Sequence, residues 1–141
     1  MTAPIRLAIS TCPNDTFAFH GLLTRAVDWR GLDFQVDLLD IDELNQRCAA
    51  AAADVCKVSF HAALDMAGDV VVLPSGSALG FGVGPLLLAA KPGTQPERLD
   101  QLTLCPGAKT TAALLFALFH PQTTGIEHVV FSEIMPRLQA G

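Results

Sequence analysis

The sequence predicts an α/β fold in which short parallel strands alternate with helices. Half of the 141 residues are apolar and only 16% are charged, a composition typical of a chain with a large interior and unlike that of a disordered one. Strand-like apolar runs alternate along the chain with segments that favour helices. This alternation implies parallel pairing of the strands through right-handed crossovers.

The first half of the chain contains four predicted strands and three predicted helices. The strands are expected over residues 5–10, 34–38, 55–59 and 70–73. The helices are expected over residues 16–24, from about 42 to 52, and 62–67. Asn14 or Asp15 is expected to cap the first of these helices, and Asp40 or Asp42 the second.

The second half begins with a segment rich in glycine, at residues 75–85, and a predicted strand at 86–90. Residues 91–96 form the most linker-like stretch, so we expect a domain boundary near Lys91 that separates residues 1–90 from residues 91–141. The elements expected beyond it are a strand ending near Leu104, a turn at 105–107, a helix over 110–119, a strand at 129–131 and a helix from Glu133.

Charge and hydropathy exclude two classes of partner. The formal net charge is -5 and no cluster of Lys or Arg is present, so we expect binding to neither nucleic acid nor an anionic membrane. The apolar stretch at 78–90 is interrupted by glycines and Pro85, and is shorter than the roughly 20 residues of a spanning helix. The apolar run from Ile5 is too short for a signal peptide, which predicts a cytoplasmic protein.

The cysteines are scattered and suggest no metal site. They are Cys12, Cys48, Cys56 and Cys105, with no CxxC pair and no histidine at ligand spacing. Neither a zinc site nor a disulfide framework follows. We therefore expect free thiols, no bound metal and no cofactor.

Ligands of open parallel sheets bind outside the carboxyl ends of the strands, which makes each loop that follows a strand a candidate wall of a pocket. The first such loop, residues 10–15, offers hydroxyl, amide and carboxylate groups, among them Asn14. Ordinary capping of the next helix is the alternative, and composition alone favours it.

The second loop contains Lys57 and Ser59 at the end of an apolar strand. Lys57 can offer a charge to an anionic ligand and Ser59 a hydroxyl. The alternative is a lysine extending from an edge strand and a serine that caps the next helix. His61 is more often a packed or capping residue in such a position than a base.

Two further loops contain glycine and hydroxyl groups. Residues 106–112 open an apolar helix with Thr110 and Thr111, a construction that can bind an anionic group, although capping and packing are equally compatible with it. A P-loop is excluded because Ala108 and Thr103 stand where that motif needs glycine. In residues 75–85, Ser75 and Gly76 can approach a ligand or form turns, and the pattern is not a dinucleotide fingerprint.

Five blocks of sequence, taken in order, resemble the 1,4-dihydroxy-6-naphthoate synthase (MqnD) family of menaquinone biosynthesis. The blocks are residues 10–17, 57–62, 75–86, 106–112 and 133–136. They cover nearly the whole chain and resemble the N-terminal part of the family. The resemblance implies a periplasmic-binding-protein-like fold of two α/β lobes around a cleft.

The resemblance also implies an activity and a set of contacts. The family is a carbon-carbon lyase of the futalosine pathway that converts cyclic dehypoxanthinyl futalosine to 1,4-dihydroxy-6-naphthoate. Its substrate contacts fall on Lys57, Val58 and Ser59 on one side of the cleft, and on Thr111 and Ala112 on the other. Further candidate contacts are Asn14, Ser75, Gly76 and Thr110.

The resemblance implies that the family's catalytic base, a histidine, lies beyond Gly141. None of the four histidines occupies its position, so no catalytic residue is assigned to this chain. We expect a fold that is incomplete at its C-terminus and lacks the return segment of its first lobe. Catalysis is then expected to be weak or absent, with an exposed interior that favours self-association or a complementing C-terminal segment. The alternative function is a non-catalytic small-molecule-binding module.

Overall fold

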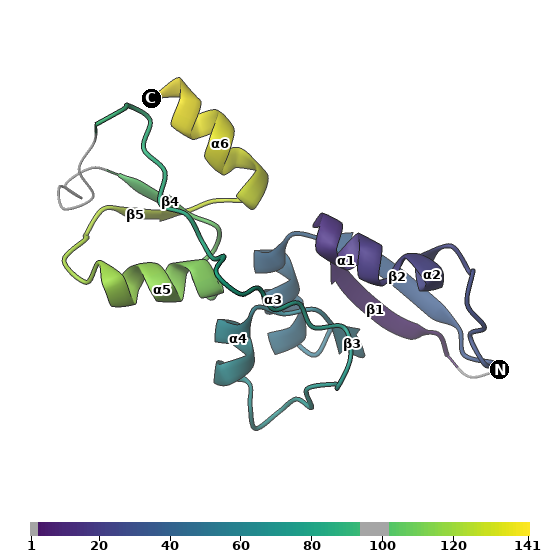
Figure 1. Cartoon of the computed structure of the whole chain (residues 1–141). Coiled ribbons are helices and arrows are strands. Elements are labelled where there is room, and N and C mark those ends of the chain that lie inside the picture. The colour runs from purple at the N-terminus through teal and green to yellow at the C-terminus, as the bar shows by residue number, and fades with distance from the viewer. Residues whose placement is uncertain (1–2, 94–101) are drawn as a thin grey trace.

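The computed structural model describes residues 3–93 and 102–141, and it contains two parallel β-sheets with helices beside them (Figure 1). The first sheet has the order β2-β1-β3, formed by β1 (Ile5–Ser10), β2 (Phe34–Leu39) and β3 (Val55–Cys56). The second sheet pairs β4 (Thr103–Cys105) with β5 (Ile126–His128). All pairings are parallel, so the predicted α/β class is confirmed.

Helices follow the strands along the chain. They are α1 (Pro13–Ala18), α2 (His20–Leu23), α3 (Ile41–Ala49), α4 (Phe60–Asp65), α5 (Thr111–Phe119) and α6 (Phe131–Ala140). Helices α5 and α6 lie on opposite sides of the β4–β5 sheet, and α3 and α4 lie between the two sheets (Figure 1). Helices α3 and α4 therefore separate the two sheets, and α4 contacts α5, which lies beside the second sheet.

Strand β1 is the centre of the first sheet. It pairs with β2 over its whole length, from Ile5 opposite Phe34 to Ser10 opposite Leu39, and with β3 on its other edge. Ile9 of β1 and Leu44 of α3 are fully buried. Because all three strands run in one direction, their carboxyl ends leave the sheet at the same edge.

The helix starts confirm one predicted cap and correct another. Asp40 caps α3, since its Oδ1 accepts a hydrogen bond from the Asp42 backbone N–H at 3.0 Å. Neither Asn14 nor Asp15 caps the first helix, which begins earlier, at Pro13, without a side-chain cap. Proline is favoured at the first helical position because its φ is already helical. The single helix predicted over 16–24 is wrong: two short helices, α1 and α2, meet at Phe19.

Several predicted element boundaries are wrong. Strand β3 ends at Cys56 rather than at residue 59, because Ser59 already caps α4. Strand β5 lies at 126–128 rather than 129–131, because α6 begins at Phe131 rather than Glu133 and Val130 is its N-cap. Helix α3 ends at Ala49, three residues before the predicted end.

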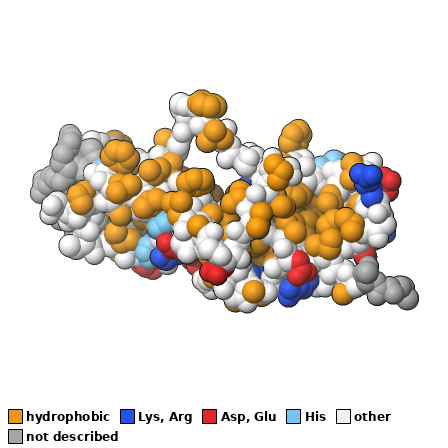
Figure 2. Space-filling view, turned by 90° about the horizontal axis from the view of Figure 1, so that it is seen from below, with side chains coloured by type: hydrophobic (Ala, Val, Ile, Leu, Met, Phe, Trp, Pro, Cys, Tyr) orange, Lys and Arg blue, Asp and Glu red, His pale blue; other side chains and the backbone are white. Residues whose placement is uncertain are grey.

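The strands predicted at 70–73 and 86–90 are absent from the structure. Apolar side chains favour a strand only where a neighbouring strand completes the hydrogen bonds, and no strand in the described residues pairs with either segment. Val71 is 87% exposed and Phe81, between the two segments, is 89% exposed. Figure 2 shows hydrophobic side chains gathered over much of the face that it views. Residues 94–96 of the predicted linker lie outside the described residues.

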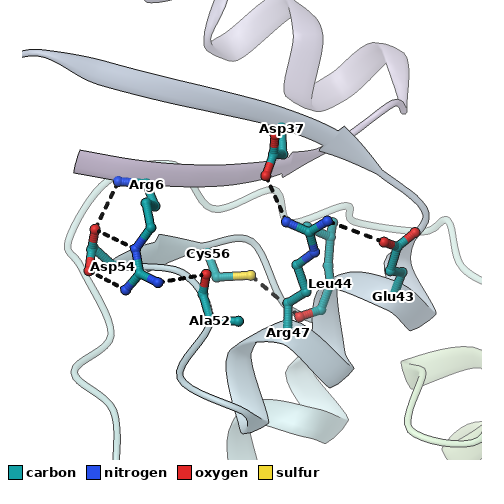
Figure 3. Close-up of polar contacts among 8 residues, drawn as sticks. All are labelled: Arg6, Asp37, Glu43, Leu44, Arg47, Ala52, Asp54 and Cys56. Atoms are coloured by element: carbon teal, nitrogen blue, oxygen red, sulfur yellow. Dashed lines mark hydrogen bonds and ion pairs between the residues drawn. The ribbon is translucent and has the colours of Figure 1, made fainter. Parts of the chain in front are cut away.

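Ion pairs connect β1 to the residue before β3, and β2 to α3 (Figure 3). Arg6 of β1 binds both carboxylate oxygens of Asp54, with its Nε at 3.1 Å from Oδ2 and its terminal nitrogen at 2.7 Å from Oδ1. The Arg6 backbone N–H also donates to Asp54, at 2.8 Å. Arg47 of α3 binds Asp37 of β2 at 2.7 Å. These bonds fasten the start of β3 to β1 and α3 to β2.

We predict that the Asp54→Asn variant has a lower free energy of unfolding at neutral pH than the original chain. We also predict that this free energy falls less steeply as the pH is lowered. The hydrogen bonds from Arg6 lower the pKa of Asp54 from its ordinary value of 3.8 to about 2. Because the pKa is lower in the folded state, the pair stabilises the protein above the unfolded pKa, and this contribution disappears as the pH falls from about 4 to about 2. Urea unfolding between about pH 2 and about pH 7 measures the effect.

The matched control for this prediction is Asp69→Asn, which changes an exposed carboxylate in the turn after α4. Its unfolding free energy should follow that of the original chain across the pH series. Equal pH dependence in Asp54→Asn and the original chain would contradict the prediction.

Candidate ligand-binding cavity

A cavity of about 570 Å³ lies where strands of both sheets end. The first sheet contributes the loop after β1, the end of β2 and Lys57 directly after β3. The second contributes Pro106, directly after β4, and residues 130–132 at the start of α6. The cavity thus lies at the carboxyl ends of parallel strands, the position at which ligands of such sheets bind.

A partly buried ion pair forms one wall of this cavity. The Lys57 ammonium lies 2.8 Å from Oδ1 of Asp15, and the two side chains are 24% and 5% exposed. The other oxygen of Asp15, Oδ2, accepts a hydrogen bond from the Ser10 backbone N–H at 3.1 Å. Lys57 is therefore a neutralised cation rather than a free one, although an ammonium has three N–H donors and this pair uses one.

The remaining wall combines apolar and acidic side chains. Leu39, Ile41 and Phe131 supply apolar surface. Asp40 and Glu43 add carboxylates, of which Asp40 is engaged in capping α3 and Glu43 lies 3.5 Å from Arg47. A hollow of this composition suits a ring-containing molecule whose polar groups face the Lys57 end.

Ser59 joins the first sheet to the start of α5. Its backbone N–H donates to Oδ1 of Asn45 at 3.0 Å, and its hydroxyl donates to the carbonyl of Lys109. The same hydroxyl accepts hydrogen bonds from Nδ2 of Asn45 at 3.2 Å and from the Ala62 N–H at 3.3 Å. The capping role considered for Ser59 is thus confirmed, and each of its hydrogen-bonding groups already has a partner, since its carbonyl accepts from the Ala63 N–H.

Thr110 caps α5, which confirms the capping alternative for this loop. Its hydroxyl donates to the Gly107 carbonyl at 2.8 Å and accepts from the Ala113 N–H at 3.3 Å, and the residue is buried. Nδ1 of His61 lies 3.2 Å from the Thr110 carbonyl. His61 therefore packs against the start of α5 rather than on the cavity wall.

The structure brings only part of the predicted set to the cavity. Lys57 and Asn14 line it. The other candidates do not line it, namely Val58, Ser59, Ser75, Gly76, Thr110, Thr111 and Ala112. The loop before α5 reaches the cavity through Pro106, and the glycine-rich segment through Ala78. The role of each candidate in ligand binding stays a prediction.

Gly76 has a conformational role that explains why glycine occupies this position. Its φ is +83°, a region that other residues adopt at a cost, and a β-carbon there would lie 3.3 Å from the Phe19 ring. A turn against α2 is therefore the structural function of this residue.

Sequence reasoning missed two residues that organise the site. Asp15 was interpreted as a helix cap or as the carboxylate of a loop that could face a ligand, and its pairing with Lys57 was not predicted. The signal for this pair was the position of Asp15 after β1, the strand that pairs with β3, which directly precedes Lys57. Asn45 was not considered, although asparagine is a weak helix former within a helical segment. A polar side chain held in a helix at that cost is a sign of a specific hydrogen-bonding partner.

The described residues also restrict the chemistry of the thiols and of metals. Burial raises the pKa of Cys56 to about 12, and the neighbouring Cys48 adds to the shift. Cys56 is thus a protonated thiol at neutral pH and a poor nucleophile. Within residues 3–93 and 102–141, no group of three or more His, Cys, Asp or Glu side chains is placed to hold a metal ion. In the same ranges, no helix has the length and hydropathy needed to cross a membrane.

Comparisons with known proteins agree in one family. The profile of the family described as "Menaquinone biosynthesis" matches residues 5–141. A Thermus thermophilus protein named 1,4-dihydroxy-6-naphtoate synthase is 34% identical over 137 residues, which are 97% of this chain and 49% of that protein. A Streptomyces coelicolor protein of the same name is 36% identical over 143 residues, again 97% of this chain and 49% of the relative.

A solved structure supports the fold. The crystal structure of protein AF1704 from Archaeoglobus fulgidus superposes with a TM-score of 0.85 at 26% sequence identity, and the match covers 96% of this chain and 49% of that one. The chain thus spans about half the length of the curated relatives and of the solved structure that it matches.

We predict that Lys57→Met destabilises the protein by about 1–3 kcal/mol at pH 7, because it leaves the buried carboxylate of Asp15 without one of its hydrogen-bond partners. The double variant Asp15→Asn with Lys57→Met removes both charges and should recover part of this loss. Urea unfolding measures both, with Lys109→Met as the control for loss of a lysine that is mostly exposed. The single variant Asp15→Asn is measured in the same way, and a double variant whose loss of stability equals the sum of the two single losses would show that the side chains are not coupled.

Proposed function

Because the chain belongs to the menaquinone-biosynthesis family, we propose that it binds cyclic dehypoxanthinyl futalosine for conversion to 1,4-dihydroxy-6-naphthoate in the futalosine pathway. The observation that carries the proposal is the match over residues 5–141 together with two relatives that are named for this product. The reaction of the whole enzyme is a carbon-carbon lyase step, and the compartment we propose is the cytoplasm. The chain contributes binding and orientation of the substrate.

The proposed architecture is a periplasmic-binding-protein-like fold of two lobes around the cavity. The first lobe comprises residues 1–90 with the β2-β1-β3 sheet, and the second comprises residues 91–141 with the β4–β5 sheet. The cavity supports this division, because its walls come from the strand ends of both sheets. The substrate would lie between the lobes.

Lys57 is the proposed contact for a polar or anionic group of the substrate. Its ammonium reaches the cavity and has N–H donors beyond the one that binds Asp15. Val58 and Ser59 continue the same segment, and Asn14 offers an amide on the neighbouring loop. Ser59 has every hydrogen-bonding group engaged, so its direct contact with substrate requires the exchange of one of these bonds.

The second set of proposed contacts is the start of α5, Thr111 with Ala112. The first N–H groups of a helix have no partner within the helix and attract anionic groups. Ser59 holds this helix start beside the Lys57 segment through the carbonyl of Lys109. A substrate that extends past Pro106 would reach it, with Thr110, Ser75 and Gly76 as further candidate contacts.

A non-catalytic small-molecule-binding module is the second candidate function. The observation that favours it is that the ionisable groups on the cavity wall are already bound to other protein groups. Asp15 has both oxygens engaged, and no histidine of the described residues lines the cavity. The other carboxylates of the wall also have protein partners, since Asp40 caps α3 and Glu43 lies 3.5 Å from Arg47. A wall whose carboxylates are all engaged in this way favours binding over proton transfer.

We predict that cyclic dehypoxanthinyl futalosine binds the chain and that Lys57→Met weakens binding about ten-fold, the effect expected for one charge-assisted hydrogen bond. Isothermal titration calorimetry at a temperature at which both proteins are folded measures it. Lys109→Met is the control, since Lys109 pairs with Asp65 at 2.6 Å away from the cavity.

Two further results of this experiment separate the candidates. Formation of 1,4-dihydroxy-6-naphthoate, followed by chromatography, would contradict the binding module, whereas binding without product is the result that this module predicts. Absence of binding to the original chain would contradict both.

The segment at 71–88 exposes many apolar side chains. We propose that a second copy of the chain or a complementing C-terminal segment covers it. Its exposed side chains include Val71, Leu79, Phe81 and Leu86, and an apolar surface of this extent marks an interaction site.

We predict self-association of the isolated chain in sedimentation velocity, and weaker self-association after Phe81→Ser and Leu86→Ser together. A monomer at all concentrations would contradict this prediction.

A further inference from the structure

We propose that Asn45 is a positioning residue that fixes the distance between the two walls of the cavity, and that it acts through Ser59. The inference rests on the proposed function for the identity of the ligand, while the geometry stands on the structure. Asn45 does not line the cavity itself. Its contribution is therefore to the placement of other groups.

Asn45 is buried in the middle of α3, where only 5% of it is exposed, next to the fully buried Leu44. Burial of an amide is unfavourable unless its groups find partners. Both ends of this amide do: Oδ1 accepts from the Ser59 N–H at 3.0 Å, and Nδ2 donates to the Ser59 hydroxyl at 3.2 Å. This pair of bonds fixes both the backbone and the side chain of Ser59.

Ser59 in turn binds the loop before α5, which belongs to the other wall of the cavity. Its hydroxyl donates to the carbonyl of Lys109, in the loop that joins β4 to α5. Nδ2 of Asn45 reaches the same carbonyl at 3.5 Å, a weaker contact. The Ser59 hydroxyl has a single proton and can donate one hydrogen bond. Because the Asn45 amide group donates to the hydroxyl oxygen, the hydroxyl proton is left to donate to the Lys109 carbonyl.

The loop between β4 and α5 also contacts α3 at a second point. Gly107 has a φ of +112°, and a β-carbon there would lie 2.8 Å from Cβ of Asp42 and 2.7 Å from its carboxyl carbon. The backbone therefore approaches α3 too closely for a side chain. Pro106, one residue earlier, forms part of the cavity wall, so the contacts with α3 determine where that wall stands.

An exposed ion pair joins the same two regions and provides the comparison. The Lys109 ammonium lies 2.6 Å from Oδ2 of Asp65, and the side chains are 59% and 48% exposed. Exposed pairs of this kind contribute little, because water and salt screen them. The bonds through Ser59, together with the close contact of Gly107 with Asp42, are thus the connections that set the geometry.

The test compares Asn45→Asp with Asp65→Asn. Asn45→Asp keeps the shape and the acceptor for the Ser59 N–H, but it removes the donor and places an oxygen toward the Lys109 carbonyl. We expect faster amide hydrogen exchange across residues 106–114, and about ten-fold weaker binding of cyclic dehypoxanthinyl futalosine by calorimetry. Asp65→Asn should leave both within about two-fold, because its ion pair is exposed.

The two readouts separate a positioning role from a purely stabilising one. Measurements are made well below the melting temperature of each variant, where both proteins are folded. Exchange of the amides in β1 reports any loss of global stability, so only a change confined to residues 106–114 is assigned to this loop. Unchanged exchange or unchanged affinity in a folded Asn45→Asp variant would overturn the inference. If the original chain binds no ligand, the proposed function fails, and the exchange of residues 106–114 still decides whether Asn45 holds this loop.

Discussion

The parallel pairing of β1 with a strand on each side is the constraint on which the rest of the structure depends. It places the ends of β1, β2 and β3 at one edge of the sheet. Asp15, after β1, and Lys57, after β3, consequently come within hydrogen-bonding distance of each other. Without this common direction, the polar residues that follow the strands would be spread over two edges, and no single cavity would collect them.

Polar groups in this site mainly hold other protein groups in place. Asp15 neutralises Lys57, Asn45 fixes Ser59, and Ser59 and Thr110 fasten the start of α5. These bonds restrain the cavity wall where Ser59 meets the start of α5, and such restraint lowers the entropic cost of ordering the site when a ligand binds. The proposed substrate contacts depend on this framework even where they do not form part of it.

Local sequence patterns predicted the elements that local forces stabilise. The alternation around Phe34 predicted β2, and the cap at Asp40 predicted the start of α3, because both depend on residues close in the chain. The strand predicted at 70–73 failed because a strand needs a partner, which no local pattern reveals. Lys57 was recognised as a candidate ligand contact from its place at the end of a strand, whereas Asn45 was missed because its partners are 14 and 64 residues away.

The most direct test of the account is a map of the ligand contacts by nuclear magnetic resonance. Cyclic dehypoxanthinyl futalosine is titrated into the isotope-labelled chain, and the amide shifts are followed. We predict shifts concentrated at residues 10–15, at Lys57 and at residues 130–132, the segments that surround the cavity. Shifts that avoid these segments and concentrate elsewhere on the surface would contradict it.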